Sequence, residues 1–164
     1  MLTATELQTR LHQIEQDYLA ENDVMKALLL AKLATLEVGG WTEECIDKIV
    51  TDFLDNRMLR DKKTVIAKLQ RTYGFKYNKD FRSIIVELVG VIGFEKIEDK
   101  LSLQCQQLET ALDELKHSRD TCAHTYTKPS MTIDGPSKMI KLLTTIENAL
   151  AAFCNELHKV QIQP

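Results

Sequence analysis

The apolar residues of the chain recur mostly three or four positions apart, which is the spacing of an amphipathic α-helix. The N-terminal segment shows this spacing through Leu7, Leu11, Ile14 and Tyr18. Thr3 and Glu6 stand three positions apart, as in a capping box. We therefore predict a first helix that begins after Thr3 and ends near Leu19.

The second segment is apolar on nearly every side, which indicates a helix in the centre of the molecule. Asn22 or Asp23 can cap it, so the pattern predicts a helix from Val24 to about Val38. The pair Gly39-Gly40 is expected to break or bend this helix. Thr42 is then expected to cap a third helix, whose apolar side carries Ile46, Ile49, Val50, Phe53 and Leu54.

Two further helices are predicted in the middle of the chain. A short one covers about residues 64–73 and ends at Gly74, a common helix stop. The next begins with Asn78 as its cap and ends near Gly93. Its apolar face consists of Phe81, Ile84, Ile85, Leu88 and Val89. This segment is rich in β-branched residues, but its spacing and the lack of a partner strand favour a helix.

The longest predicted helix runs from about Phe94 to Tyr126 along a single seam of near-heptad spacing. The seam consists of Ile97, Leu101, Cys105, Leu108, Leu112, Leu115, Arg119, Cys122 and Tyr126. A loop with two prolines follows over residues 127–136, and a last helix is expected from Ser137 to about His158. We predict an all-α fold in which residues 1–164 form a single helical bundle of five to six helices.

Composition narrows the class of protein. With 164 residues, 44% hydrophobic and 27% charged, the chain suits one globular domain and is unlike a disordered protein. We expect no contact with a membrane and a cytoplasmic location, because we find neither an apolar stretch of about 20 residues nor a secretory signal. The four cysteines are scattered, so we expect reduced core residues, no metal site and no cofactor.

Charge is distributed unevenly along the chain, although the total is only −3. Residues 1–56 carry a net charge of −7, whereas residues 57–82 carry +7. A basic block of this kind can attract phosphates, and Lys62, Lys63 and Arg71 are its candidate substrate-binding residues. The alternative is a solvated helix surface that binds nothing.

Candidate chemistry is concentrated near the end of the longest predicted helix. Arg119 and Tyr126 lie about 20° apart on an ideal helix and share the apolar seam. An arginine buried there needs a partner or an anion, because an unpaired buried charge costs several kcal/mol. Asp120 and His124 are four residues apart and share a second face, so Asp120 can orient the imidazole.

His124 lies about 140° from Arg119 on an ideal helix, so a straight helix does not aim both side chains at one point. Two arrangements can bring them together. The helix can end or distort near His124, or two copies can cross in a twofold dimer that pools both pairs in one groove. The leucines of the seam suit either core packing or such a dimer contact.

The stretch Arg119-Asp120-(three residues)-His124-Thr125-Tyr126 resembles the HEPN superfamily, whose signature is an arginine followed four to six residues later by a histidine. Tyr126 extends the match to the Arg-x4-His-x-Tyr form of many HEPN toxins. The layout is also similar: a long apolar second helix, a basic connector, the motif late in a helix, and a proline-containing loop before a last helix. The resemblance is strongest to the RiboL-PSP type of HEPN protein, which is associated with bacterial defence and toxin systems. Asp120 departs from the pattern, because asparagine is commoner there.

The resemblance implies a metal-independent endoribonuclease that acts as a toxin or defence effector. The RNA 2′-hydroxyl would attack the adjacent phosphate, with His124 as general acid or base, Arg119 stabilising the phosphorane and Asp120 orienting His124. Tyr126 would position a phosphate. The implied partners are RNA, a second copy in a homodimer, and an antitoxin or regulatory protein.

Two other interpretations stay open. Arg119 and His124 can be cations that stabilise the last turns of a helix, which is favourable by about 0.3–1 kcal/mol. The chain can also be a catalytically inactive helical module that binds RNA, a nucleotide or a protein partner. Glu37 is a further candidate neighbour of the motif, and Trp41 is expected to be a packing anchor.

Overall fold

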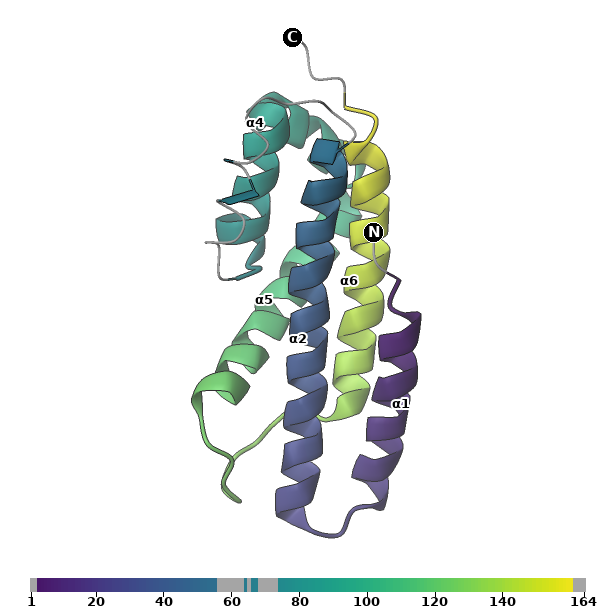
Figure 1. The fold of residues 1–164 in the computed structure, drawn as a ribbon, viewed down its shortest axis with the longest axis vertical. Coiled ribbons are helices and arrows are strands. Elements are labelled where there is room, and N and C mark those ends of the chain that lie inside the picture. The colour runs from purple at the N-terminus through teal and green to yellow at the C-terminus, as the bar shows by residue number, and fades with distance from the viewer. Residues whose placement is uncertain (1–2, 56–63, 65, 68–73, 161–164) are drawn as a thin grey trace.

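The computed structural model describes residues 3–55, 64, 66–67 and 74–160 (Figure 1). In these ranges the protein is all-α, as predicted. The elements are α1 (Thr5–Ala20), α2 (Val24–Asp55), a π-helical turn η1 (Tyr77–Phe81), α4 (Arg82–Lys100), α5 (Ser102–His124) and α6 (Pro136–Leu157). The short helix predicted over residues 64–73 lies mostly outside the described residues. None of the helices described is long and apolar enough to cross a membrane.

Helices α1, α2, α5 and α6 pack along one another, and α4 with η1 covers one end of this bundle (Figure 1). The core is filled by buried aliphatic and aromatic side chains from all of these elements. Phe153 of α6 contacts Phe81 edge-on, with ring centroids 5.0 Å apart, and lies 5.9 Å from Phe94 of α4. The aromatic contacts therefore attach the α4 and η1 layer to the bundle. All four cysteines are buried and free, which confirms their predicted place in the core.

Helix α2 runs without interruption through Gly39-Gly40, so the prediction of two helices was wrong. Thr42 does not cap a third helix. Its hydroxyl donates to the carbonyl of Val38 within α2 at 2.8 Å. Gly39 instead allows a close approach, because a Cβ atom there would lie 3.0 Å from Cγ of Arg119. The start of α2 agrees with the prediction, since Asp23 Oδ1 accepts from the backbone N–H of Met25 at 2.8 Å.

The capping box predicted at the first helix was also wrong. The residue that precedes α1 is Ala4, and no side chain caps the helix. The backbone N–H of Ala4 donates to Glu147 Oε1 of α6 at 2.8 Å, and Gln8 donates to the other oxygen of that carboxylate at 3.1 Å. A contact with the last helix therefore fixes where α1 begins.

The helix predicted from Phe94 to Tyr126 is divided in the structure. Leu101 has φ −117° and ψ 32°, which ends α4 at Lys100 and lets α5 begin at Ser102. A second break lies inside α4 at Gly90, whose φ of 74° belongs to the region that glycine tolerates best. Asn78 does not cap this helix, because its side chain donates to Glu109 of α5 at 2.6 Å.

Candidate functional site

The last two turns of α5 carry three of the four residues of the sequence motif. Arg119, Asp120 and His124 lie on α5, which stays helical up to His124. Thr125 then adopts an extended conformation with φ −123° and ψ 129°. The helix therefore ends at His124 without any distortion between Arg119 and His124, and the 140° separation expected for an ideal helix remains.

Arg119 is held between α5 and α2. Its side chain is only 21% exposed, and its guanidinium donates to the carboxylate of Glu43 on α2. The same guanidinium donates to Asp120 Oδ1 at 3.3 Å, and its Cζ lies 5.6 Å from the ring centroid of Phe75. Two carboxylates and an aromatic face therefore compensate for the partial burial of the charge.

The sequence predicted that Arg119 needs a partner, and that partner is Glu43; the expectation that Glu37 lies near the motif was wrong. Glu37 faces α1 instead, where its carboxylate pairs with Arg10 at 3.5 Å. Glu43 follows Gly39 by four residues, so it lies one helical turn further along the same side of α2. The signal that could have found it is this pairing of a glycine with an acidic residue one turn later, opposite a seam arginine.

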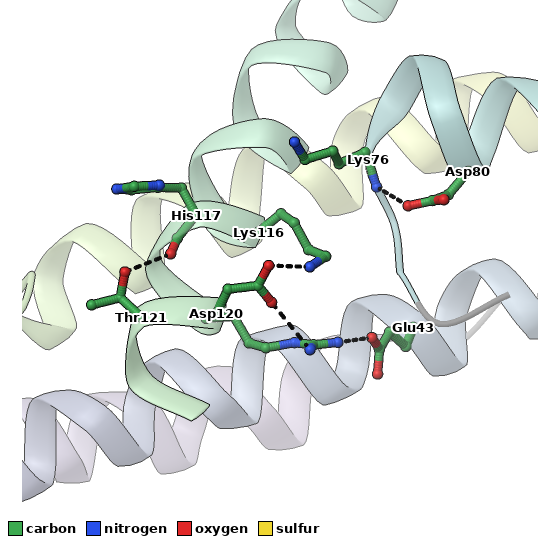
Figure 2. A network of polar contacts seen from close by, with 8 residues as sticks. Glu43, Lys76, Asp80, Lys116, His117, Asp120 and Thr121 are labelled. Atoms are coloured by element: carbon green, nitrogen blue, oxygen red, sulfur yellow. Dashed lines mark hydrogen bonds and ion pairs between the residues drawn. The ribbon is translucent and has the colours of Figure 1, made fainter. Parts of the chain in front are cut away.

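Asp120 links Arg119 to a lysine on the same helix. Its carboxylate accepts a hydrogen bond from Lys116, and the chain Glu43–Arg119–Asp120–Lys116 forms a continuous polar network (Figure 2). The hydrogen bond from Lys116 holds the pKa of Asp120 below its ordinary range, and the charges of Arg119 and His124 act in the same direction. Asp120 is therefore a carboxylate at neutral pH that faces a guanidinium and interacts electrostatically with an imidazole.

The segment before η1 borders this network from the other side. Asp80, which is 9% exposed, accepts from the backbone N–H of Lys76 at 2.9 Å (Figure 2). A Cβ atom on Gly74 would lie 2.6 Å from Asp80 Oδ2 and 3.4 Å from Cε of Lys116. Glycine at position 74 therefore lets the chain pass between a buried carboxylate and the lysine that binds Asp120.

His124 differs from Arg119 because it is exposed and has no hydrogen bond with any residue that the structure describes. The end of the helix beside it is held from α2, since Lys32 Nζ donates to the carbonyl of Thr125 at 3.0 Å. His117 lies about two turns before His124 on the same side of α5, away from Arg119, and its carbonyl accepts from Thr121 at 3.0 Å (Figure 2).

Tyr126 does not lie on the helical seam with Arg119, so that prediction was wrong. It follows the extended Thr125 and is 77% exposed. Lys128 lies over its ring, with Nζ 5.6 Å from the centroid. The helix ends two residues before Tyr126. The seven-residue spacing between Arg119 and Tyr126 therefore does not place their side chains on one face.

The seam of α5 packs inside the bundle. Leu108, Leu112 and Leu115 are all buried, so of the two uses that the sequence allowed, these leucines serve the core and not a dimer contact. Because the seam is buried, the exposed surface near the site lies at His124 and along α2.

The basic block is only partly described. Lys62, Lys63 and Arg71 lie outside the described residues. Of the other members, Lys76 and Lys79 are exposed, whereas Arg82 stacks on Phe94 at 5.1 Å and pairs with Glu98 at 3.8 Å. Lys76 carries positive charge next to the polar network, because its backbone binds Asp80.

In the part of the chain that the structure describes, no cluster of three or more His, Cys, Asp or Glu side chains could hold a metal ion. Comparisons of the chain with protein-family models, with curated proteins and with solved structures find no match. The resemblance to the HEPN superfamily therefore depends on the residues from Arg119 to Tyr126 and on the order of the helices.

Proposed function

We propose that the protein is a metal-independent endoribonuclease of the HEPN type that acts as a toxin or defence effector. The observation that carries the proposal is that Arg119, which donates to Asp120 at 3.3 Å, and the exposed His124 lie about one turn apart at the end of α5. A guanidinium next to an imidazole combines charge stabilisation with proton transfer, which are the two functions that RNA cleavage needs without a metal.

In the proposed reaction the 2′-hydroxyl oxygen of the RNA attacks the adjacent phosphorus atom, and the bond to the 5′-oxygen breaks. An imidazole removes the proton of the 2′-hydroxyl or gives a proton to the departing 5′-oxygen. The products are a 2′,3′-cyclic phosphate and a 5′-hydroxyl, so no water is consumed. Imidazole suits either step, because its ordinary pKa of about 6.5 is near neutral pH.

Arg119 would bind the phosphorane through the donors that remain available. A guanidinium has five N–H groups, and the contacts with Glu43 and Asp120 occupy two of its nitrogen atoms. The partly exposed edge of the side chain can then meet a phosphate oxygen with the planar geometry that arginine offers to phosphates. Asp120 would orient His124, and the exposed Tyr126 would contact a neighbouring phosphate.

The proposal includes RNA as the substrate, a homodimer as the working particle, an antitoxin or other regulatory protein as a partner, and the cytoplasm as its location. The geometry of α5 supports the proposed dimer. Because the helix is regular between Arg119 and His124, a second copy is the remaining way to bring a guanidinium and an imidazole to opposite sides of one phosphate.

The experiment is cleavage of a labelled RNA in the presence of a metal chelator. The parent protein should produce fragments that end in a cyclic phosphate, and both His124→Ala and Arg119→Ala should reduce cleavage at least 100-fold, about the effect of removing one catalytic group. His117→Ala is the matched control, because His117 is also an exposed histidine of α5 but lies about 10 Å from His124 along the helix axis. Equal cleavage by all four proteins would refute the proposal.

A second candidate is a helical module that binds RNA, a nucleotide or a protein partner without cleaving RNA. The ion pair between Glu43 and Arg119 favours it, since a guanidinium that already binds two carboxylates serves the structure of the helix pair. This candidate predicts RNA binding that weakens with salt and no cleavage by the parent protein, so the same samples distinguish the two functions.

A further inference from the structure

Helix α2 has an apolar stripe on the side that faces solvent. Leu29, Leu33 and Leu36 are 52%, 44% and 36% exposed and are followed by the exposed Gly40. Their 4-3-4 spacing places all four within about 60° of the helix surface, nearly opposite the buried side of α2. Solvent-facing leucines at this spacing are typical of a helix that packs against another helix.

The stripe ends beside a hollow that has room for a side chain. A cavity of about 290 Å³ is lined by Leu36, Gly40 and Trp41 of α2 and by Leu7 and Arg10 of α1. A Cβ atom on Gly40 would meet nothing within 4 Å, so the helix surface is open there. The apolar stripe therefore combines protruding leucines at one end with an empty position at the other.

This pattern is complementary to itself when one copy of α2 is turned end for end. In one antiparallel register Leu33 meets Leu36 of the partner, and Leu29 lies over Gly40 of the partner. The flanking charges agree with this register, because Lys26 comes within one residue of Glu44 of the partner on the same flank. Both are exposed. Desolvation and the neighbouring carboxylates of Glu43 and Glu44 raise the pKa of Asp47, and this acidic end of α2 therefore favours a positively charged neighbour.

We propose that the solvent-facing stripe of α2 is the self-association surface of this protein and that two copies pair their α2 helices antiparallel around a twofold axis. The occupant of the stripe is therefore a second copy of the same chain. The arrangement closes on itself, as most homo-oligomeric interfaces do. Apolar contacts lie along its middle and charged residues along its edge.

The proposed pairing also has a consequence for the candidate site, and this consequence rests on the proposed function. A twofold axis perpendicular to α2 puts both α5 helices on the same side of the dimer. Arg119 contacts Gly39, and the end of α5 is bound by Lys32. In the proposed register, Gly39 of the partner comes level with residue 30, so Arg119 of one copy and His124 of the other lie within about two helical turns along α2.

The test is the oligomeric state of the full-length chain, measured by sedimentation at micromolar concentration. The parent should sediment at twice the 18.7 kDa of the single chain. Leu33→Asp should be a monomer, and Gly40→Leu should weaken association at least tenfold because it fills the position under Leu29. The control Leu103→Asp, at a 60% exposed leucine near the other end of α5, should remain a dimer.

All three substitutions are at exposed positions, so the variants should keep their helical circular dichroism. A parent that is monomeric throughout the micromolar range would overturn the proposal. A dimer that Leu33→Asp leaves intact would also overturn it, because the contact would then lie elsewhere. Neither measurement involves RNA. A dimer formed through another surface would refute this interface while the nuclease proposal stands, and a dimer of this kind that cleaves no RNA would refute the nuclease proposal while the interface stands.

Discussion

The two ends of the motif on α5 contrast sharply although they are only five residues apart. Arg119 is enclosed by Glu43, Asp120 and the ring of Phe75, whereas His124 is exposed at the end of the helix. The first environment holds a side chain in place, and the second leaves a side chain accessible to a ligand. The contrast indicates that Arg119 contributes to stability as well as to the proposed chemistry, while His124 contributes to the chemistry alone.

The largest effect is expected when the substitutions of Arg119 and His124 are placed on different chains of one dimer. Arg119→Ala and His124→Ala should each be inactive on RNA alone. Mixed dimers should recover about one quarter of the parent rate, because half of the dimers are mixed and each has one intact pair. Cleavage assays on the mixed and unmixed samples measure this recovery. No recovery from dimers shown to exchange subunits would mean that Arg119 and His124 of the same chain act together.

Removal of Arg119 should also lower stability. Arg119→Ala loses an ion pair and the packing of its side chain against α2, so we expect a loss of about 2 kcal/mol in the free energy of unfolding. His124→Ala should change it by less than about 0.5 kcal/mol, as for other exposed positions. Urea unfolding of the two variants gives the comparison. Equal losses would show that the environments are not as different as the structure indicates.

The glutamate partner should matter more than its neighbour. Glu43→Gln keeps the shape of the side chain but removes the charge that faces Arg119, and it should cost about 1 kcal/mol. Glu44→Gln is the matched control, and it should cost less than about 0.5 kcal/mol because Glu44 is an exposed residue. The same unfolding measurement applies, and identical values for both variants would contradict the role assigned to Glu43.

The two glycines of α2 provide a finer test of the contact between Arg119 and α2. Gly40→Ala should stabilise the protein by about 0.5–1 kcal/mol, since alanine favours a helix and the position is open. Gly39→Ala should give less, because the new methyl group lies 3.0 Å from Cγ of Arg119 and must displace it. Thermal unfolding of both variants measures the difference, and an equal gain would show that Arg119 does not press on Gly39.

The smallest effect concerns the charge of Asp120. Its pKa is lowered in the folded state, so its contribution to stability is present above the unfolded pKa of about 3.9 and disappears as pH falls through the lower folded value. Asp120→Asn should therefore be less stable than the parent near pH 7, by under about 1 kcal/mol because the side chain is well exposed, and equally stable near pH 2. Asp113→Asn, at an exposed position of α5, should show no such change.

Sequence patterns predicted a helix correctly where the pattern within that helix alone determines its bounds. The apolar stripe of α6 and the loop before it follow from local spacing, and the structure has them within one or two residues. Features that depend on a contact between helices could not be predicted in this way. The start of α1 is set by Glu147, and the continuity of α2 at Gly39 is coupled to the side chain of Arg119.

The same limit applies to the candidate site. The spacing of Asp120 and His124 predicted a shared face, and both residues lie about one turn apart on α5, although no hydrogen bond joins their side chains in the described residues. The partner of Arg119 lies 76 residues away along the chain, so the spacing around Arg119 alone does not distinguish Glu43 from Glu37. The sequence left open that the helix ends near His124, as it does, although the apolar seam continues to Tyr126 and predicted a later end.

The most direct test measures cleavage and stability on the same preparation of His124→Ala. Our account predicts an unfolding free energy within about 0.5 kcal/mol of the parent and a loss of RNA cleavage of at least about 100-fold in the presence of a chelator. An equally stable variant that cleaves RNA as fast as the parent, or a parent protein that cleaves no RNA, would contradict the account.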